Sequence, residues 1–538
     1  MSSEKRTTET PISPPSETPP LRRSSSGLSE ADARTSKKYA AFGNIPLSHA
    51  PQGQSSRWDV LTDKLLGWSV ESRGILPVPP EQRTDPQFWK VFFLWLSANL
   101  NILSFSAGTL GPIAFGLNLK DSFGVIVGFN VLGCLLPAYF ATFGPKLGLR
   151  QMCQARYSFG FYWVTIPAFL NSTTMFGFMV LNCILGGQTL SSASIAMASD
   201  GTPAGGGMSW DVGIVVVGIV SLFISFCGFR VLNLYERVAW LPILIVYCIA
   251  LGVSGKDLIS SSPALPEHGS AQQILTFGAS IAGFVISYCP LSSDFTSYFP
   301  PHVPGWKVFL STFAGLFLPT VLVQLLGAAF ATALLTNPAW TNAYNSAGLA
   351  GLFHIILLPA GPGFARFLLV VLAFSVTANV APTLYSFSLS AQTTLPFDWI
   401  VRVPRFIFSF VCTAALVPIS IVASTRFYSA LNNFLGLISY WSACFGAVVT
   451  VEHLVFRRGS FANYRVEDWD RARRLPPGYA AILGAVTGIG IIVLCMDQVW
   501  FVGPIAKTTG DIGFEIGFAV SACTYAVLRG IEQRIAHR

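Results

Sequence analysis

Charged side chains are scarce in this chain of 538 residues. Asp, Glu, Lys and Arg together make up 11% of it, whereas hydrophobic residues make up 52% and aromatic residues 13%. Soluble domains carry about 25% charged residues, so a soluble fold of this length could not cover its surface. The composition therefore indicates an all-α integral membrane protein, with the lipid bilayer as its main partner.

The chain also lacks the motifs of common enzyme classes. It contains no HExxH, no P-loop GxxxxGK[ST] and no GxGxxG that opens a helix after a strand. None of its six histidines lies in the middle of an apolar segment. Asp294 is the only acidic residue well inside an apolar segment near a helix break, so the facing aspartates of an intramembrane protease are missing. We predict that the protein is not an enzyme and holds no cofactor.

Neither a metal site nor a disulfide framework is expected from the ten cysteines. None forms a CxxC pair, and each falls in or beside an apolar segment, where buried and unreactive thiols are the usual outcome. Residues 1–88 contain no secretory h-region, so we expect no cleaved signal peptide. The cysteines are Cys134, Cys153, Cys183, Cys227, Cys248, Cys289, Cys412, Cys444, Cys495 and Cys523.

About twelve apolar segments are long enough to cross a bilayer as a helix of roughly 20 residues. Residues 1–58 are rich in Ser, Thr, Pro and charge, which predicts a disordered tail. Residues 59–89 are typical of a short amphipathic helix at the membrane surface followed by a proline-stiffened lead-in. In loop 336–360, the weakly amphipathic piece Gly348–Leu358 is expected along the outer face. The predicted spans are 90–117, 121–143, 160–190, 209–229, 236–259, 272–299, 306–335, 362–391, 402–424, 427–455, 479–500 and 511–531.

Positive charges indicate which ends of these spans face the cytoplasm. With the N-terminus inside, all but five of the 34 Lys and Arg residues fall in the tail, the inner loops or the C-terminus, as the positive-inside rule requires. Loop 456–478 and the C-terminus 532–538 are then cytoplasmic, as is the N-terminus. This topology explains the net charge of +8 better than a nucleic-acid partner does. The five exceptions are Lys120, Lys256, Arg366, Arg426 and Lys507.

Two predicted spans are interrupted in a similar way. Interrupted helices five spans apart are typical of two inverted five-helix repeats with a site between them, although glycine and proline are also common in ordinary membrane helices. We expect a first repeat over 90–259, a second over 260–455 and two further spans over 479–531. The interrupting residues are Gly108, Gly111 and Pro112 in the first span and Gly283, Cys289 and Pro290 in the sixth.

Polar and aromatic side chains recur at similar depth in four spans. A bilayer core cannot hydrate an amide, and Pro382 leaves a backbone carbonyl without its partner, so such groups face protein or a water-filled cavity. Aromatic faces with amide donors and acceptors suit a small planar heterocycle. The alternative for each residue is a contact between helices, typically under about 1 kcal/mol. The candidate substrate-binding residues are Ser97, Asn101, Ser104, Phe178, Asn182, Tyr288, Asn379 and Thr383.

Several strings of residues carry a resemblance to a known family. They are Trp95-Leu96-Ser97-Ala98-Asn99, Gly108-Thr109-Leu110-Gly111-Pro112, Arg156-Tyr157-Ser158-Phe159-Gly160, Asn182 with Gly186-Gly187, Asp294-Phe295-Thr296-Ser297-Tyr298, Pro382, Tyr385-Ser386 and Ser390-Ala391-Gln392. The chain resembles the fungal purine–cytosine permeases of the nucleobase:cation symporter-1 family over roughly residues 70–530. The resemblance implies a LeuT-like 5+5 inverted-repeat fold with two extra C-terminal helices. It also implies proton-coupled uptake of a nucleobase, such as cytosine or a purine, at the plasma membrane.

Three positions depart from the pattern of that family. The resemblance places its third-helix amide on Asn182 and its first-helix polar contact on Asn101, but Phe178 and Tyr288 stand where the family has tryptophan. In the eighth helix, Asn379-Val380-Ala381-Pro382-Thr383 replaces the usual Asn-Asn-Ile-Pro-Asn. Because an unmatched buried polar edge costs about 1–3 kcal/mol, we expect ligand recognition to differ from the family default.

The resemblance also bears on the coupling ion. Sodium in this fold is held by first-helix carbonyls and eighth-helix hydroxyls, and the latter positions fall on Thr377 and Ala378. One hydroxyl is therefore missing, which favours a proton over sodium. Asp294 and Glu236 are the candidates for carrying that proton, and a structural salt bridge is the alternative role for each.

Three hypotheses follow for the function. The first is a secondary transporter that moves a nucleobase and a proton by alternating access. The second is a transporter-like receptor that signals through its long N-terminal tail. The third keeps the transport fold and changes the substrate to a vitamin-type heterocycle such as pyridoxine.

Overall fold

Helices make up most of the part of the chain that the computed structural model describes. The structure describes residues 74–226, 228–260, 265–394, 403 and 405–536, all of which belong to one unit, Ser55–Arg538. The predicted tail 1–58 and the first part of the amphipathic lead-in, 59–73, lie outside the described residues. The described part of the lead-in is mostly extended and contains one short 3₁₀ turn, η2 (Pro80–Gln82).

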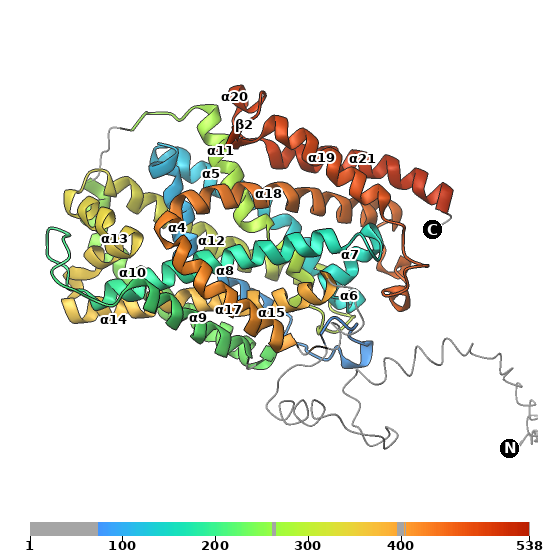
Figure 1. The fold of residues 1–538 in the computed structure, drawn as a ribbon, viewed down its shortest axis with the longest axis horizontal. Helices are drawn as coiled ribbons and strands as arrows, with labels where there is room; N and C mark the ends of the chain where they lie inside the picture. The colour runs from blue at the N-terminus through green and yellow to red at the C-terminus, as the bar shows by residue number, and fades with distance from the viewer. Residues whose placement is uncertain (1–73, 227, 261–264, 395–402, 404, 537–538) are drawn as a thin grey trace, which may run out of the picture. The chain divides into compact units, whose positions relative to one another are not determined.

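The helices follow one another through the whole described chain (Figure 1). They are α3 (Lys90–Asn99), α4 (Ile102–Ala114), α5 (Leu119–Ala141), α6 (Phe143–Leu147), α7 (Gln151–Phe159), α8 (Thr165–Ser194), α9 (Trp210–Phe226), α10 (Gly228–Ser260), α11 (Ala271–Ile286), α12 (Gly305–Leu334), α13 (Pro338–Leu357), α14 (Pro362–Ala373), α15 (Thr377–Thr394), α17 (Arg405–Ala423), α18 (Phe427–Val451), α19 (Tyr479–Cys495), α20 (Ala506–Thr509) and α21 (Gly513–Ala536).

Short turns connect or extend several of these helices. The 3₁₀ turns are η3 (Cys289–Phe295), η4 (Leu358–Ala360), η5 (Phe374–Val376), η6 (Ser424–Arg426), η8 (Phe461–Asn463) and η9 (Val466–Asp468), and η7 (Glu452–Phe456) is π-helical. Two antiparallel strands, β1 (Asp497–Gln498) and β2 (Phe501–Val502), form a small hairpin between α19 and α21, with Asp497 opposite Val502. The hairpin is a minor addition to an all-α architecture.

Ten described helical segments are long and apolar enough to cross a membrane, and the bent pair α3–α4 would be an eleventh. The helices α9 and α19 are also apolar but have only 17 residues each. The prediction of an all-α membrane protein with many spans is confirmed. The number of twelve spans stays a prediction. Two of the predicted spans, α9 and α19, are shorter than the ten spanning helices, and one of those ten, α13, lies where no span was predicted.

Helix α13 corrects the expectation for loop 336–360. We expected only the piece Gly348–Leu358 to be weakly amphipathic, whereas the helix begins ten residues earlier and kinks at Ala347 and Gly348, where φ of the glycine is 60°. The side chain of Asn337 accepts hydrogen bonds from two amides of the first turn, and proline follows it as the first helical residue. These start signals were readable in the sequence. The helix lies at the end of the bundle opposite α6 and α7 (Figure 1).

The first predicted span is broken, but not at the glycines. Helix α3 ends at Asn99, α4 begins at Ile102, and their axes differ by 55°. Asn101 has an extended backbone, and its side chain accepts a hydrogen bond from the Ser104 amide at 2.8 Å, which caps α4. The prediction that Gly108 to Pro112 interrupt this span is wrong, because they lie inside α4.

Close packing explains the glycine that we expected at the break. A Cβ atom added to Gly108 would overlap the backbone carbonyl oxygen of Gln324 on α12, so the glycine allows α4 and α12 to touch. Gly283 plays the same part between α11 and α18, where an added Cβ would overlap the carbonyl oxygen of Leu435. The second break follows at Ser287 and Tyr288, between α11 and η3.

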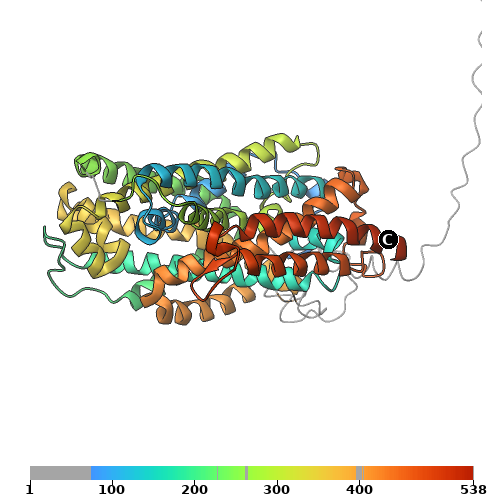
Figure 2. The ribbon, with the colours of Figure 1, turned by 90° about the horizontal axis from the view of Figure 1, so that it is seen from above.

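The two C-terminal helices pack on each other and on α18 (Figures 1 and 2). A buried ion network joins α21 to the end of α18. Glu452, which follows α18, accepts hydrogen bonds from Tyr525 at 2.8 Å and from Arg529 at 3.2 Å, both on α21. Arg457 bonds the other oxygen of the same carboxylate at 2.9 Å. The carboxylate therefore ties α21 to the end of α18.

Candidate substrate-binding site

Side chains from four elements meet beside the first helix break. On α15, the amide nitrogen of Asn379 donates to the Ala98 carbonyl of α3 at 3.0 Å and to the Tyr288 hydroxyl at 3.2 Å. Its oxygen accepts from Asn182 Nδ2 of α8 at 3.0 Å. The Tyr288 hydroxyl in turn donates to Asn99 Oδ1 at 3.0 Å. All four polar side chains are buried.

Aromatic rings form one side of this cluster. The ring of Tyr288 is nearly parallel to that of Phe178, with an interplanar angle of 13° and centroids 6.4 Å apart. The centroid of the Trp95 indole lies 4.8 Å from that of the Tyr288 ring, and the two ring planes are tilted by 56°. Phe178 also contacts Phe284 and Phe434 edge-on, which holds its ring in place.

Two buried polar side-chain atoms of the cluster have no hydrogen-bond partner among the described residues. They are the side-chain amide oxygen of Asn182 and the indole nitrogen of Trp95. A buried polar atom without a partner costs roughly 1–3 kcal/mol, so such atoms are usually satisfied by a ligand or by water. Together they offer an acceptor and a donor beside flat rings. This set matches the edge and faces of a small planar heterocycle.

The candidates named from the sequence do not all join this cluster. Phe178, Asn182, Tyr288 and Asn379 meet directly, and Thr383 lies one turn along α15, where its hydroxyl donates to the Asn379 carbonyl at 2.6 Å. The remaining candidates make other contacts: Ser97 donates to the backbone carbonyl of Glu236, Asn101 caps α4, and Ser104 lies in the first turn of α4.

Sequence reasoning did not select two members of the cluster, Trp95 and Asn99. Asn99 donates from Nδ2 to the Trp95 carbonyl at 3.0 Å, so the two residues are one turn apart on α3. The available signal was that both residues stand in the string Trp95-Leu96-Ser97-Ala98-Asn99, which resembles the family. The position of the break decides which amide of the string reaches Tyr288, and we had placed the break further along.

Asp294, on η3, connects elements away from the cluster. Its carboxylate accepts from the backbone amide of Gln151, the first residue of α7, at 2.8 Å and from the Ser386 hydroxyl of α15 at 3.0 Å. Arg150 Nη1 donates to the Asp294 carbonyl at 2.6 Å. Asp294 thus caps α7 and joins it to α15, which is a structural arrangement.

Thr377 is hydrogen-bonded to the residue that precedes Glu236 on α10. The hydroxyl of Tyr235, on α10, is hydrogen-bonded to the Thr377 hydroxyl at the start of α15. Glu236 follows Tyr235 and is only 1% exposed. Its carboxyl group lies near the Ser97 hydroxyl, but neither carboxyl oxygen makes a well-formed hydrogen bond with the described residues. The hydroxyl that could hold a cation at Thr377 is therefore already hydrogen-bonded.

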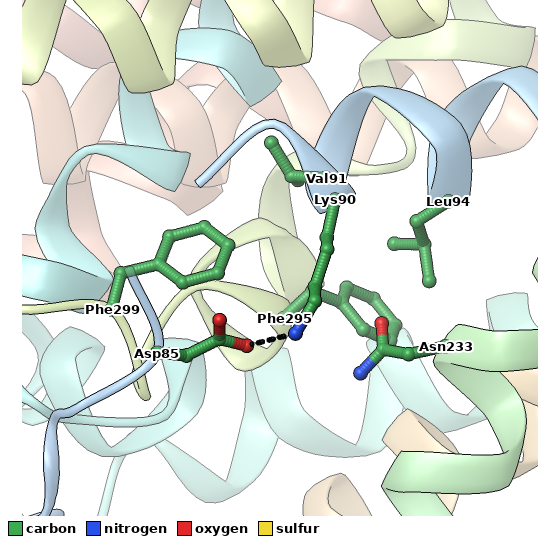
Figure 3. Close-up of a pocket in the computed structure, with 7 residues that line it drawn as sticks. All are labelled: Asp85, Lys90, Val91, Leu94, Asn233, Phe295 and Phe299. Carbon is green, nitrogen blue, oxygen red and sulfur yellow. Dashed lines mark hydrogen bonds and ion pairs between the residues drawn. The ribbon is translucent and has the colours of Figure 1, made fainter. Parts of the chain in front are cut away.

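A small pocket is lined by Asn233, which stands about one helical turn before Glu236 on α10 (Figure 3). Its size is near that needed by a single water molecule. Asp85 of the lead-in and Lys90 at the start of α3 form a 2.7 Å ion pair beside it. Val91, Leu94, Asn233, Phe295 and Phe299 complete its lining.

No group of three or more His, Cys, Asp or Glu residues that could hold a metal ion is found among the described residues. The nine cysteines that the structure describes are free, and two of them, Cys248 and Cys523, are exposed rather than buried. The other seven are buried, as expected for most cysteines of apolar segments.

Comparisons with known proteins agree with this architecture. Residues 77–517 match the family described as permease for cytosine/purines, uracil, thiamine, allantoin. The chain is 36% identical over 471 residues to the purine-cytosine permease fcyB of Emericella nidulans, covering 86% of this chain and 89% of the relative. It is 29% identical over 535 residues to the vitamin B6 transporter TPN1 of Saccharomyces cerevisiae, covering 88% and 89%.

The fold is also that of a solved transporter. Mhp1, a nucleobase-cation-symport-1 family transporter in a closed conformation with bromovinylhydantoin bound, superposes with a TM-score of 0.66 at 14% identity, over 86% of this chain and 96% of Mhp1. The predicted LeuT-like fold is confirmed by this likeness. The family consists of permeases, which also confirms that the chain is not an enzyme. The chain belongs to the permease family for cytosine, purines, uracil, thiamine and allantoin and is a multi-pass membrane transporter.

Proposed function

We propose that this protein takes up a nucleobase of the cytosine or purine type together with a proton. The observation that carries the proposal is the cluster in which Asn182 and Asn379 meet the Tyr288 hydroxyl beside three aromatic rings. A nucleobase is planar and carries donors and acceptors on its edge. The relative fcyB, a purine-cytosine permease, has its substrate class in its name and supports the same class here.

In this proposal, the substrate stacks against the aromatic rings and bonds to the free groups of the cluster. The unpaired side-chain amide oxygen of Asn182 would accept from an exocyclic amine or ring N–H, and the Trp95 indole would donate to a ring nitrogen or carbonyl. The direct bonds between Asn182, Asn379 and Tyr288 must partly open to admit it. The site residues proposed from sequence that remain outside the cluster, Ser97, Asn101 and Ser104, would then hold α3 and α4 in position.

Transport would proceed by alternating access around this site. The broken helices α3–α4 and α11–η3 meet the cluster from both halves of the fold, and discontinuous helices of this kind can rock against a scaffold. The topology that we infer places both termini and the α7 end of the bundle in the cytoplasm, and the α13 end outside. Loop 456–478, with its arginines, lies at the α7 end, as the positive-inside rule requires. The membrane would be the plasma membrane.

A proton is the coupling ion in this proposal. The Thr377 hydroxyl is bonded to Tyr235, and the next residue, Ala378, has no oxygen in its side chain, so the expected sodium ligands are incomplete. A carboxyl group can take the place of a cation site by binding a proton.

A second substrate class is favoured by a specific observation. The chain is similar to the vitamin B6 transporter TPN1 over most of both lengths. Its site also has a phenylalanine, a tyrosine and a threonine at Phe178, Tyr288 and Thr383, where the resemblance of the sequence implied two tryptophans and an amide. Fewer amides on the edge suit a pyridine-type ring. The receptor hypothesis rests on residues 1–58, which lie outside the described residues.

Competition for uptake separates these substrates. Cells that lack their own permeases and express this chain would be given radiolabelled cytosine with an excess of adenine, hypoxanthine, uracil, allantoin or pyridoxine. We expect cytosine uptake that adenine or hypoxanthine inhibits and pyridoxine does not. Labelled pyridoxine uptake that cytosine fails to inhibit would support the vitamin-type substrate. Absence of uptake for all six compounds would overturn the proposed function.

A further inference from the structure

The buried carboxyl of Glu236 takes no part in the hydrogen bonds of the substrate cluster. It lies on α10, inside a candidate membrane span, and neither of its oxygens makes a well-formed hydrogen bond with the described residues. The Ser97 hydroxyl, which lies beside it, donates to the backbone carbonyl of Glu236 instead. Buried carboxyl groups in other parts of the described chain are bonded, as Glu452 and Asp294 are. A membrane-embedded carboxyl with no partner is expected to have a functional role.

The surroundings place Glu236 between the substrate cluster and the α7 end. Ser97, which contacts Glu236, precedes Ala98, whose carbonyl accepts from Asn379 in the cluster. In the other direction, Leu94 and Asn233 line the pocket of Figure 3, and each lies three residues, or about one turn, before Ser97 and Glu236 on the same helices. One turn of α3 and α10 therefore separates the carboxyl from this pocket.

Charged groups on the neighbouring elements are engaged elsewhere. Lys90 of α3 pairs with Asp85 at 2.7 Å. Arg237, the next residue of α10, is exposed and lies over the ring of Trp89 at 5.3 Å. Tyr235 is bonded to Thr377. On the elements nearer the outer end, His354 of α13 contacts Ser192 of α8, and α14 carries Arg366.

We propose that Glu236 is the proton-binding group of the transport cycle and that it releases its proton to the α7 end through the pocket beside Asp85 and Lys90. This inference rests on the proposed function. With α3 packed against α10, the carboxyl is buried and no cation of the described residues pairs with it, so a bound proton would neutralise its charge in this arrangement. Movement of α3 away from α10 would extend the pocket to Glu236, hydrate the carboxyl and allow the proton to pass to water. The charge of the carboxyl and the opening of this side are then coupled.

The test uses the purified full-length chain in proteoliposomes with the substrate found in the competition experiment. Two activities are measured: accumulation driven by an acid exterior, and counterflow exchange without a gradient. For Glu236→Gln we expect accumulation to fall at least tenfold, to the level seen without a gradient, while counterflow stays within about threefold of wild type. The matched control is Glu515→Gln on α21, which also has a carboxyl oxygen without a partner and should accumulate normally.

Each result decides between outcomes. Gradient-driven accumulation by Glu236→Gln at the wild-type level would overturn the inference and leave the proposed function intact. Loss of both activities in a folded variant would also overturn it, since the residue would then serve binding or structure. Wild-type protein that neither accumulates nor exchanges any compound of the panel would instead overturn the proposed function.

A second measurement on the wild-type chain covers the case in which Glu236→Gln does not fold. A hydrophobic carbodiimide reacts with protonated carboxyl groups in apolar surroundings, and peptide mapping locates the modified residue. We expect Glu236 to be modified at neutral pH, more rapidly as the pH falls, with parallel loss of accumulation. Loss of accumulation with no modification at Glu236 would overturn the inference.

Discussion

At the scale of single residues, the Tyr288 hydroxyl joins the polar side chains of the candidate site. It donates to Asn99 and accepts from Asn379, so it links α3 and α15 through the second broken helix. The ring beneath it stacks with Phe178. The same side chain therefore fixes the positions of two amides and contributes a face for stacking.

Tyr288→Phe separates these two contributions. The ring remains, and the loss of one hydroxyl costs about 0.5–1.5 kcal/mol, or roughly 2- to 13-fold in affinity. We expect the KM for uptake to rise by this amount, with unchanged surface expression. Tyr139→Phe is a control outside the cluster, since its ring packs near His453. Equal KM values for Tyr288→Phe and wild type would show that the hydroxyl does not contribute to substrate binding.

Asp294 differs from Glu236 in having partners for its carboxylate. We expect Asp294→Ala to lower thermal stability, because α7 loses its cap, an effect of about 0.5–2 kcal/mol, and Ser386 loses its acceptor. A thermal unfolding assay on purified protein measures this. Glu236→Gln should show no comparable loss. An unchanged melting temperature for Asp294→Ala would contradict the structural role that we assign to it.

Many residues of the site were predictable from sequence, because amides and a proline at membrane depth must face protein or water rather than lipid. Asn182, Asn379, Phe178 and Tyr288 were selected on this ground and lie together. Asn99 was not selected, because its neighbour Asn101 looked equivalent and only the helix break distinguishes them. The partners of Asp294 could not be predicted, since Gln151 is distant in sequence and the contact depends on how α7 folds back.

At the scale of elements, the breaks in the first and sixth spans set the geometry of the site. Their existence was predictable from spacing, but the position of the first was not. Glycine signals both a break and close packing, and here Gly108 serves the packing of α4 on α12. The asparagine that caps α4 was the correct signal, and a capping motif inside an apolar segment is easily overlooked.

Gly108→Ala tests this packing. The new Cβ would overlap a backbone oxygen of α12, which cannot move without shifting the helix, so we expect a loss of folded protein at the membrane of severalfold. Gly124→Ala on α5 is the matched control, since a Cβ there meets nothing within 4 Å and alanine favours the helix. Fluorescence-detected size-exclusion chromatography compares the two. Equal amounts of both variants would contradict the close approach of α4 and α12.

At the scale of the whole molecule, the two C-terminal helices are attached to the transport core through α18. Their addition was expected from the resemblance of the sequence, but the attachment was not. Glu452, Arg457, Tyr525 and Arg529 are spread over loop 456–478 and two spans, and their pairing becomes visible only when α21 lies on α18. The network connects α21 to the end of α18.

Arg529→Ala should detach this pair in part. Removing one partner of a buried ion pair costs about 3–5 kcal/mol, so we expect a lower melting temperature, with transport per folded molecule close to wild type. Arg534→Ala, which removes an exposed arginine from the same helix, is the control and should unfold like wild type. A melting temperature for Arg529→Ala equal to that of the control would contradict a stabilising role for the network.

Equilibrium binding tests the central claim most directly. The claim is that amides and rings from α3, α8, η3 and α15 and their junctions surround the substrate. Purified wild type, Asn182→Ala and Asn379→Ala would be titrated with the radiolabelled substrate identified by competition. We expect saturable binding to wild type and a loss of affinity of at least tenfold in each variant, with unchanged size-exclusion profiles. Wild-type affinity in both variants would contradict the claim, because the two amides could not then be in contact with the substrate.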